Sequence, residues 1–140
     1  MINSNTAPYA ALLLRLSLGV MFIAHALLKL VVFTLPGTVK FFETVGYPGS
    51  LAYVVFSAEL VGGALLILGV YTRWVSLALI PILIGAAMVH FPNGWVFSAP
   101  NGGWEYPVFL AVVCAVQALL GDGALALRAP AAGISTRQPA

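Results

Sequence analysis

Four long apolar runs dominate this chain of 140 residues and constrain its fold more than any other feature. They cover roughly residues 9–33, 50–70, 74–91 and 106–121. A helix needs about 20 mostly apolar residues to cross the hydrocarbon core of a bilayer, and the first three runs approach or exceed that length. The fourth is short of the usual minimum of about 17 residues and requires local thinning of the bilayer or continuation past Asp122. The pattern predicts an all-α integral membrane protein with four spans.

The composition agrees, because 61% of the residues are hydrophobic and only 7% are charged. Ordinary soluble domains carry roughly 25% charged residues. We therefore expect one membrane domain over residues 1–127, with no room for a soluble catalytic domain, and a flexible tail over 128–140. The net charge is +2 with no basic run, which argues against nucleic acid as a partner. Arg15 inside the first run, with no convincing cleavage motif after it, favours an uncleaved span over a signal peptide.

The segments between the runs predict how the spans connect. Apolar residues at helical spacing in 39–45 predict a short helix along the membrane interface. Tyr71-Thr72-Arg73 is so short a turn that the second and third spans should form an antiparallel hairpin. Pro81 predicts a bend in the third span. Gly62, four residues after Ala58, predicts a close approach of another helix. Together these features predict a four-helix bundle.

Basic residues near the span ends suggest an orientation. The side that carries both termini has the larger group: Arg15, Arg73, Arg128 and Arg137. The opposite side has Lys40, with Lys29 near it. By the positive-inside rule this modest bias places both termini in the cytoplasm and the two longer connections outside.

Several ionisable residues lie inside the apolar runs or at their edges, where charge is costly and marks a functional site. They are Arg15, His25, Lys29, Glu59, His90 and Glu105. At a rise of 1.5 Å per residue, all except Arg15 fall in the outer half of the predicted bundle. His25 and Lys29 are four residues apart and so share one helix face, which must turn toward protein or a wet cavity.

Structural roles compete with functional ones at these positions. Arg15 and Lys29 could extend their charged ends to the lipid headgroups. Glu59 could belong to a structural ion pair, and His25 could be a satisfied core histidine. His90 and Glu105 could cap and organise the outer loop, and Asn93 could be a turn residue.

Three chemistries suit the polar residues. A cavity with His25, Lys29 and Glu59, lined by aromatics such as Phe22 and Phe56, could hydrogen-bond the carbonyls of a quinone and carry the coupled protons. A proton or small-solute path could use the same groups as relays. A metal site is weakly supported, since no two histidines share a helix at short spacing, and none is predicted. The chain has no CxxC, phosphate loop or Rossmann fingerprint, so no haem, flavin or nucleotide site is expected.

Several motifs together resemble the DoxX family of small bacterial four-helix membrane proteins. They are Leu13-Leu14-Arg15-Leu16-Ser17-Leu18-Gly19 with His25 and Lys29, Glu59-Leu60-Val61-Gly62-Gly63, Gly69-Val70-Tyr71-Thr72-Arg73, His90-Phe91-Pro92-Asn93-Gly94, and Gly103-Trp104-Glu105-Tyr106-Pro107. The resemblance covers roughly residues 12–121 and implies a multi-pass protein of the bacterial inner membrane. Relatives are linked to redox processes, including a quinone-reducing thiosulfate oxidoreductase subunit and partners in oxidative-stress complexes.

The resulting hypothesis is a redox-associated membrane subunit that binds a quinone-like molecule in an outward-facing polar cavity, as a non-autonomous part of a quinone-linked oxidoreductase. His25 and Glu59 are the expected catalytic residues, and Arg15, Lys29, His90, Asn93 and Glu105 the expected ligand-binding residues. One alternative is a non-catalytic scaffold that recruits soluble redox enzymes to the membrane. Another is a small-solute or proton transporter. Glycine-rich helix faces also suggest a homo-oligomer.

Overall fold

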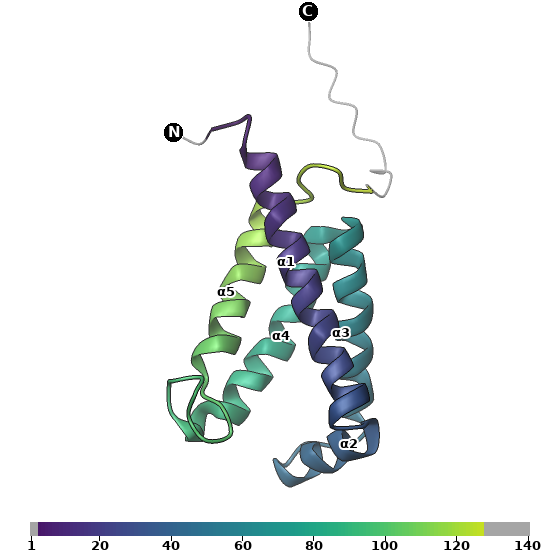
Figure 1. Ribbon diagram of the computed structural model, residues 1–140, viewed down its shortest axis with the longest axis vertical. Coiled ribbons are helices and arrows are strands. Elements are labelled where there is room, and N and C mark those ends of the chain that lie inside the picture. Colours follow the sequence, from purple (N-terminus) through teal and green to yellow (C-terminus); the bar gives the residue numbers. More distant parts are fainter. Residues whose placement is uncertain (1–2, 128–140) are drawn as a thin grey trace, which may run out of the picture.

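The computed structural model describes residues 3–127, and every regular element within that range is a helix (Figure 1). The elements are α1 (Ala7–Leu27), the π-helical turn η1 (Leu28–Val32), α2 (Leu35–Thr44), α3 (Leu51–Leu68), α4 (Thr72–His90), the 3₁₀ turn η2 (Phe91–Asn93) and α5 (Glu105–Leu120). The predicted all-helical architecture is confirmed. The predicted tail, with Arg128 and Arg137, lies outside the described residues.

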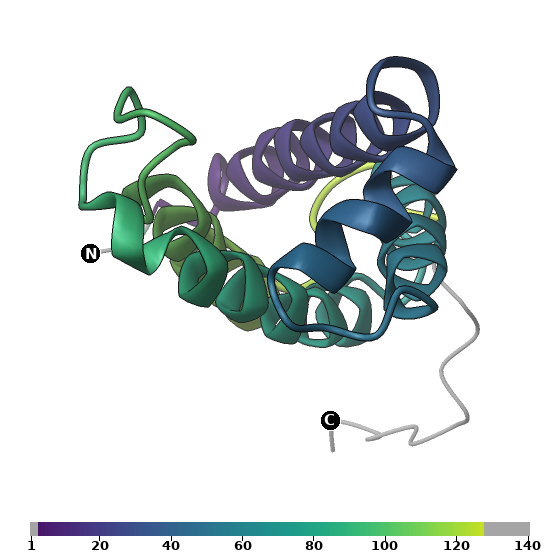
Figure 2. The ribbon, with the colours of Figure 1, turned by 90° about the horizontal axis from the view of Figure 1, so that it is seen from below.

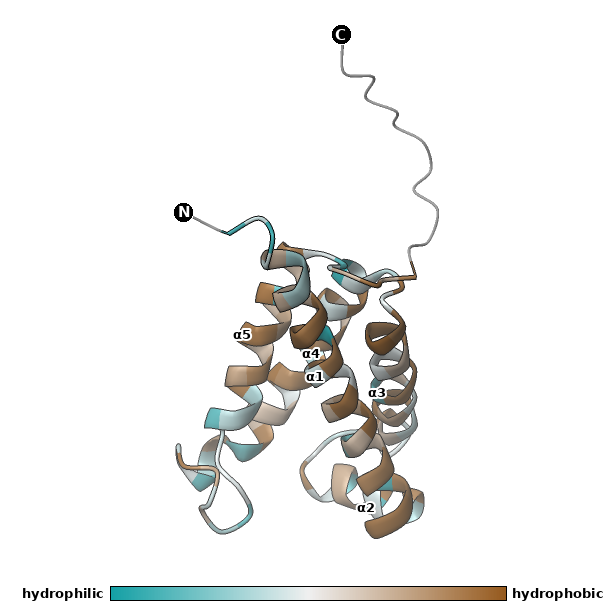
Figure 3. Cartoon of the chain, turned by 45° about the horizontal axis from the view of Figure 1, so that its top comes forward, coloured by the Kyte–Doolittle hydropathy of each residue, from teal (hydrophilic) through white to brown (hydrophobic). Residues whose placement is uncertain are grey.

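Within the described residues, three helical segments are long and apolar enough to cross a membrane. They are Ala7–Val32, Leu51–Leu68 and Thr72–Asn93. The apolar helix α5, with 16 residues, is shorter. Hydrophobic residues make up most of these helices, which are largely brown in Figure 3, and many of their large apolar side chains are exposed on the outside of the protein. An exterior this apolar suits a lipid environment, so the chain is a membrane protein.

Helices α1, α3, α4 and α5 form a closed ring (Figure 2). In this ring α1 contacts α3 and α5, and α4 contacts the same two helices. The centre of the ring is filled by apolar side chains from all four helices: Leu18, Phe22, Leu66, Leu79, Leu83, Leu110 and Cys114. We call this cluster the apolar core. Buried polar side chains lie outside this cluster, and one of them, Glu59, is at the middle of α3.

Glycine allows α1 and α3 to pack closely. A Cβ atom added at Gly63 would lie 2.8 Å from the carbonyl oxygen of Gly19, and one added at Gly19 would lie 2.7 Å from that of Gly63. No side chain fits at either position. The predicted small-residue contact at Gly62 exists but faces the Leu79 side chain of α4, so the closest backbone approach is one residue later than the sequence suggested.

The connections gather at two ends (Figure 1). The lower end carries α2 and the segment 94–104, which we call the aromatic loop. The upper end carries the start of α1, the turn between α3 and α4, and segment 121–127. Gly69, with φ of 72°, ends α3 in the left-handed conformation that a tight reversal requires. α2 lies across the lower end and packs on η1 and α3 (Figure 2), where an interfacial helix was predicted.

Candidate functional site

An ion pair joins the first span to α3. Lys29 Nζ lies 2.7 Å from Glu59 Oε2 and 2.9 Å from Oε1, so the ammonium bridges both carboxylate oxygens. The side chains are 17% and 7% exposed, respectively. Two opposite charges this close inside apolar helices neutralise each other, which lowers the cost of holding them away from water.

The α-helix changes to a π-helix at Lys29. Residues Leu28–Val32 form a π-helical turn, closed by a hydrogen bond of 2.9 Å from Phe33 N to Leu28 O. The hydroxyl of Thr38 in α2, a buried residue, donates to Thr34 O at 2.9 Å and lies 3.5 Å from Lys29 O. Single π-helical turns inside α-helices are frequent at functional sites. Here the turn, supported by α2, sets the direction in which Lys29 leaves the helix.

His25 lies one helical turn before Lys29 on the same face. Its Nδ1 is 2.9 Å from the carbonyl oxygen of Met21, and its ring stacks on Tyr106 of α5 with centroids 6.2 Å apart. The Tyr106 hydroxyl donates to the Met21 sulfur at 2.7 Å. Because a carbonyl only accepts, this contact is a hydrogen bond when Nδ1 carries the proton, and the neutral ring then offers Nε2 as a base. His25 makes its hydrogen bond to Met21 and not to the ion pair, but because it shares a helix face with Lys29 we group it with Lys29 and Glu59 under the name charged triad.

His90, Asn93 and Glu105 form a second group, at the aromatic loop. His90 Nδ1 lies 3.0 Å from Asn101 O, and Asn93 Nδ2 donates to Asn101 O at 3.2 Å and Gly102 O at 2.9 Å. Glu105 Oε1 accepts from Phe97 N at 3.0 Å. The loop and α2 lie on different sides of the same end (Figures 1 and 2). These three residues therefore organise the loop, and they make none of the hydrogen bonds of the charged triad.

Arg15 lies far from both groups, near the upper end. Its side chain is only 1% exposed and donates to the carbonyls of Leu66 at 3.0 Å, Ile67, and Ala124 at 2.9 Å. The guanidinium thus satisfies carbonyls in the last turn of α3, where a positive charge also opposes the helix dipole. It does not extend to headgroups, and the apolar core separates it from the charged triad.

Further polar residues at this upper end were not among the predicted site residues. Arg73 Nε donates to Ala118 O at 3.1 Å, tying the start of α4 to the end of α5. Thr72, Ser76 and Gln117 are fully buried. The buried polar atoms with no protein partner among the described residues are Arg15 Nε, Thr72 Oγ1, Ser76 Oγ and Gln117 Oε1. The lone amide of Gln117 in an apolar run was a signal that could have revealed this group.

Metal ligands do not cluster in the part of the chain that the structure describes. Among residues 3–127 no group of three or more histidine, cysteine, aspartate or glutamate side chains could hold a metal ion.

Comparison of the sequence with known proteins identifies the family of this chain. A family model described as DoxX matches residues 10–92, more than half of the chain. The chain belongs to the DoxX family. This DoxX protein is also 36% identical over 117 residues to a protein of Bacillus subtilis (strain 168) named "Putative oxidoreductase CatD", and the match covers 83% of this chain and 82% of that one. No solved structure gives a significant match.

The matched region of this DoxX protein contains the whole charged triad as well as Arg15 and His90. Asn93 and Glu105 lie beyond it, in the aromatic loop and at the start of α5. The family model thus spans α1 to α4, while α5 completes the ring and supplies the Tyr106 ring that stacks on His25.

Proposed function

We propose that this DoxX protein is a redox-associated subunit of the bacterial inner membrane that holds the head group of a quinone-like molecule at the charged triad. The observation that carries the proposal is the Lys29–Glu59 ion pair, one helical turn from His25 and largely screened from solvent. Apolar side chains of the same volume would serve stability as well or better, so a charged pair inside a span is expected to have a function. The name of the Bacillus subtilis relative supports a redox role.

Each residue of the charged triad has a distinct role in this proposal. Lys29 Nζ donates to one carbonyl oxygen of the head group. Reduction of a quinone to a quinol takes two electrons and two protons. His25, at Nε2, and Glu59, at its carboxylate, first take up one proton each from the outer aqueous phase and then give these protons to the two quinone oxygens. The electrons come from a soluble redox partner. His90, Asn93 and Glu105 shape the loop beside the site, and Arg15 supports the opposite end.

The proposed topology has four spans, formed by α1, α3, α4 and α5, with both termini in the cytoplasm. The short α5 crosses with local thinning of the bilayer. Arg15 and Arg73 then lie toward the cytoplasm, in keeping with the positive-inside rule. The charged triad, α2 and the aromatic loop lie in the outer half, so a quinone-like ligand would enter from the outer leaflet.

The test is mass spectrometry of small molecules extracted from gently purified protein, comparing wild type with Glu59→Gln and His25→Ala. Glu43→Gln, which changes an exposed carboxylate on α2, is the matched control. We expect wild type and the control to retain a quinone at near-stoichiometric level and both triad variants to lose it while still folding. Bulk lipid alone in every sample would contradict the proposal and favour the scaffold that recruits soluble redox enzymes.

A further inference from the structure

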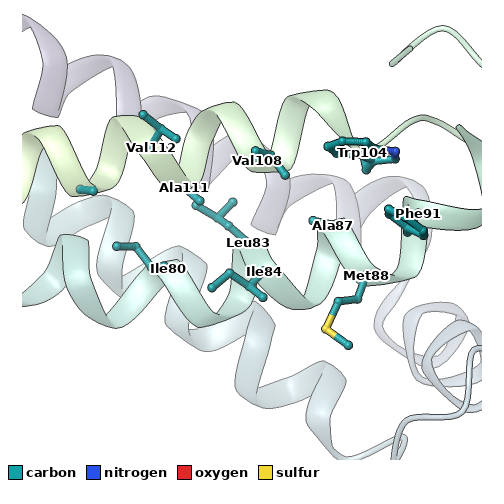
Figure 4. A pocket seen from close by; sticks show the side chains of 11 residues that line it. Ile80, Leu83, Ile84, Ala87, Met88, Phe91, Trp104, Val108, Ala111 and Val112 are labelled. Atoms are coloured by element: carbon teal, nitrogen blue, oxygen red, sulfur yellow. The ribbon is translucent and has the colours of Figure 1, made fainter. Parts of the chain in front are cut away.

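A second binding surface lies between α4 and α5 (Figure 4). It is a groove of about 640 Å³ whose lining carries no charged side chain. Ala87 and Ala111 leave space between flanking side chains from the two helices, such as Ile84 on α4 and Val112 on α5. The volume falls within the roughly 300–1,000 Å³ typical of small-molecule sites. None of the charged triad lines it, so this surface is independent of the proposed quinone site.

The length and position of the groove indicate what fills it. It runs along α4 from Ile80 to the start of η2 at Phe91, which at 1.5 Å per residue is about 16 Å, or roughly half of the 30 Å hydrocarbon core. Its outer end is closed by Phe91 and Trp104, whose rings lie 5.6 Å apart next to the polar residues of the aromatic loop. Tryptophan at the end of a span marks the headgroup level. The groove therefore extends from the interface to the middle of the membrane, the depth of a single leaflet.

We propose that this groove binds one acyl chain of a phospholipid from the leaflet nearest the aromatic loop. An acyl chain enters a leaflet from the headgroup level and ends near the midplane, as the groove does. A helix from a second copy would instead cross both leaflets and would need a contact surface along the whole of α4. The apolar lining matches a hydrocarbon chain, and the small alanines allow the chain to lie between the two helices rather than on top of them.

The probe is phosphatidylcholine with bromine atoms on one acyl chain, which quenches tryptophan fluorescence on contact. It is added in increasing amounts to the purified full chain in detergent. The protein carries Trp74→Phe, so that the remaining tryptophans, Trp95 and Trp104, both lie at the aromatic loop. We expect quenching that saturates at one lipid per chain.

Two variants that fill the groove from opposite walls, Ala111→Phe on α5 and Ala87→Leu on α4, test the site. Each should raise the midpoint of quenching at least tenfold. The matched control is Ala64→Phe, on an exposed part of α3 away from the groove, which should leave the midpoint unchanged. Two variants are used because one of them could fail to fold.

Three results would overturn the proposal. Quenching that rises in proportion to lipid without saturating would show contact with bulk lipid only. An unchanged midpoint in the folded groove variants would place the lipid elsewhere. A dimer by light scattering that Ala111→Phe dissociates, without saturable quenching, would assign the groove to a second copy of the chain.

Discussion

At the residue scale, Lys29 and Glu59 are partly buried charges that neutralise each other. Removing one partner leaves the other charge in an apolar setting without compensation. We expect Glu59→Leu or Lys29→Met to lower the free energy of unfolding by about 3 kcal/mol, measured by denaturant titration in detergent micelles. The double variant should lose much less than the sum of the single losses, because it leaves no isolated charge.

Strictly additive losses would contradict this coupling. The double variant also separates stability from function, since it should fold well and yet bind no quinone-like ligand. A double variant that retains such a ligand would count against the proposed function and leave the ion pair as a structural feature.

Arg15 is a second buried residue whose role depends on its particular side chain. Its guanidinium reaches three carbonyls on two segments, α3 and 121–127, which the single ammonium of lysine cannot reproduce. Arg15→Lys should lower the free energy of unfolding by about 1–3 kcal/mol, because buried acceptors lose their donor. The melting temperature should fall as well. Arg73→Lys is the control, because Arg73 is exposed and its one hydrogen bond is to Ala118 O, and it should cost less than 1 kcal/mol. Equal losses in the two variants would contradict this assignment.

The sequence identified most of these residues as unusual but not how they are grouped. Charged residues inside apolar runs are recognisable because a charge within the membrane costs free energy. Helical spacing correctly predicted that His25 lies on the same helix face as Lys29. The partner of Arg15 is backbone carbonyl, which every residue carries, so no sequence pattern could reveal it. The π-helical turn that directs Lys29 toward Glu59 likewise depends on the packing of α2, a tertiary contact.

At the element scale, the packing of α1 on α3 depends on Gly19 and Gly63. A methyl group at Gly63 would meet the Gly19 carbonyl at 2.8 Å, and backbone cannot move aside cheaply. We expect Gly63→Ala to destabilise the protein by about 1–3 kcal/mol in thermal unfolding, as overpacking does in other cores.

The control for this effect is Gly85→Ala in α4, where an added Cβ meets nothing within 4 Å. Alanine is the better helix former by about 1 kcal/mol, so this variant should be neutral or slightly stabilising. A loss at Gly85 equal to that at Gly63 would indicate a general effect of replacing glycine rather than close helix packing.

The aromatic loop is held by side-chain hydrogen bonds as well as by backbone hydrogen bonds of its turns, such as those from Trp104 N to Gly94 O at 3.2 Å and from Gly102 N to Ala99 O at 2.8 Å. Asn93→Ala removes two hydrogen bonds to the carbonyls of Asn101 and Gly102. We expect faster hydrogen–deuterium exchange across 94–104 with no change in α1 or α3. Asn5→Ala, an exposed change near the N-terminus, should leave exchange in the loop as in wild type. Unaltered exchange in the loop of Asn93→Ala would show that its remaining contacts, such as the hydrogen bond from Phe97 N to Glu105 Oε1 and the Trp95–Trp104 ring contact, keep it ordered without Asn93.

Apolar runs and turn residues predicted the helices well, because membrane length and proline or glycine signals act locally. The interfacial helix was expected at 39–45 and begins earlier, at Leu35, since Thr34 Oγ1 accepts from Gly37 N and starts the helix there. Pro81 lies inside a continuous α4. Which helix faces attract each other could not be predicted, because apolar residues surround every helix of a membrane protein.

At the scale of the whole molecule, polar groups lie at two levels with the apolar core between them. Arg15 and the buried hydroxyls and amide lie toward the upper end, and the charged triad lies on the other side of residues such as Phe22 and Leu79. A proton relay needs hydrogen-bonding groups at each step, and among the core side chains only the thiol of Cys114 is one, and a weak one.

We therefore expect proteoliposomes loaded with a pH-sensitive dye to lose a proton gradient no faster than vesicles without protein. Faster loss in wild type, abolished by Glu59→Gln, would contradict this expectation and revive the transporter hypothesis. A leak that Glu59→Gln leaves unchanged would trace to imperfect vesicles rather than to the charged triad.

The apolar core has one more consequence, for the cell's energy supply. Bacteria store energy as an electrical and chemical potential across the inner membrane. When one elementary charge crosses a membrane that carries 100 mV, its free energy changes by about 2.3 kcal/mol. In the proposed inner-membrane location, the layer of packed hydrocarbon side chains is expected to block the movement of ions through the protein under that voltage. Many copies could then reside in an energised membrane without discharging it.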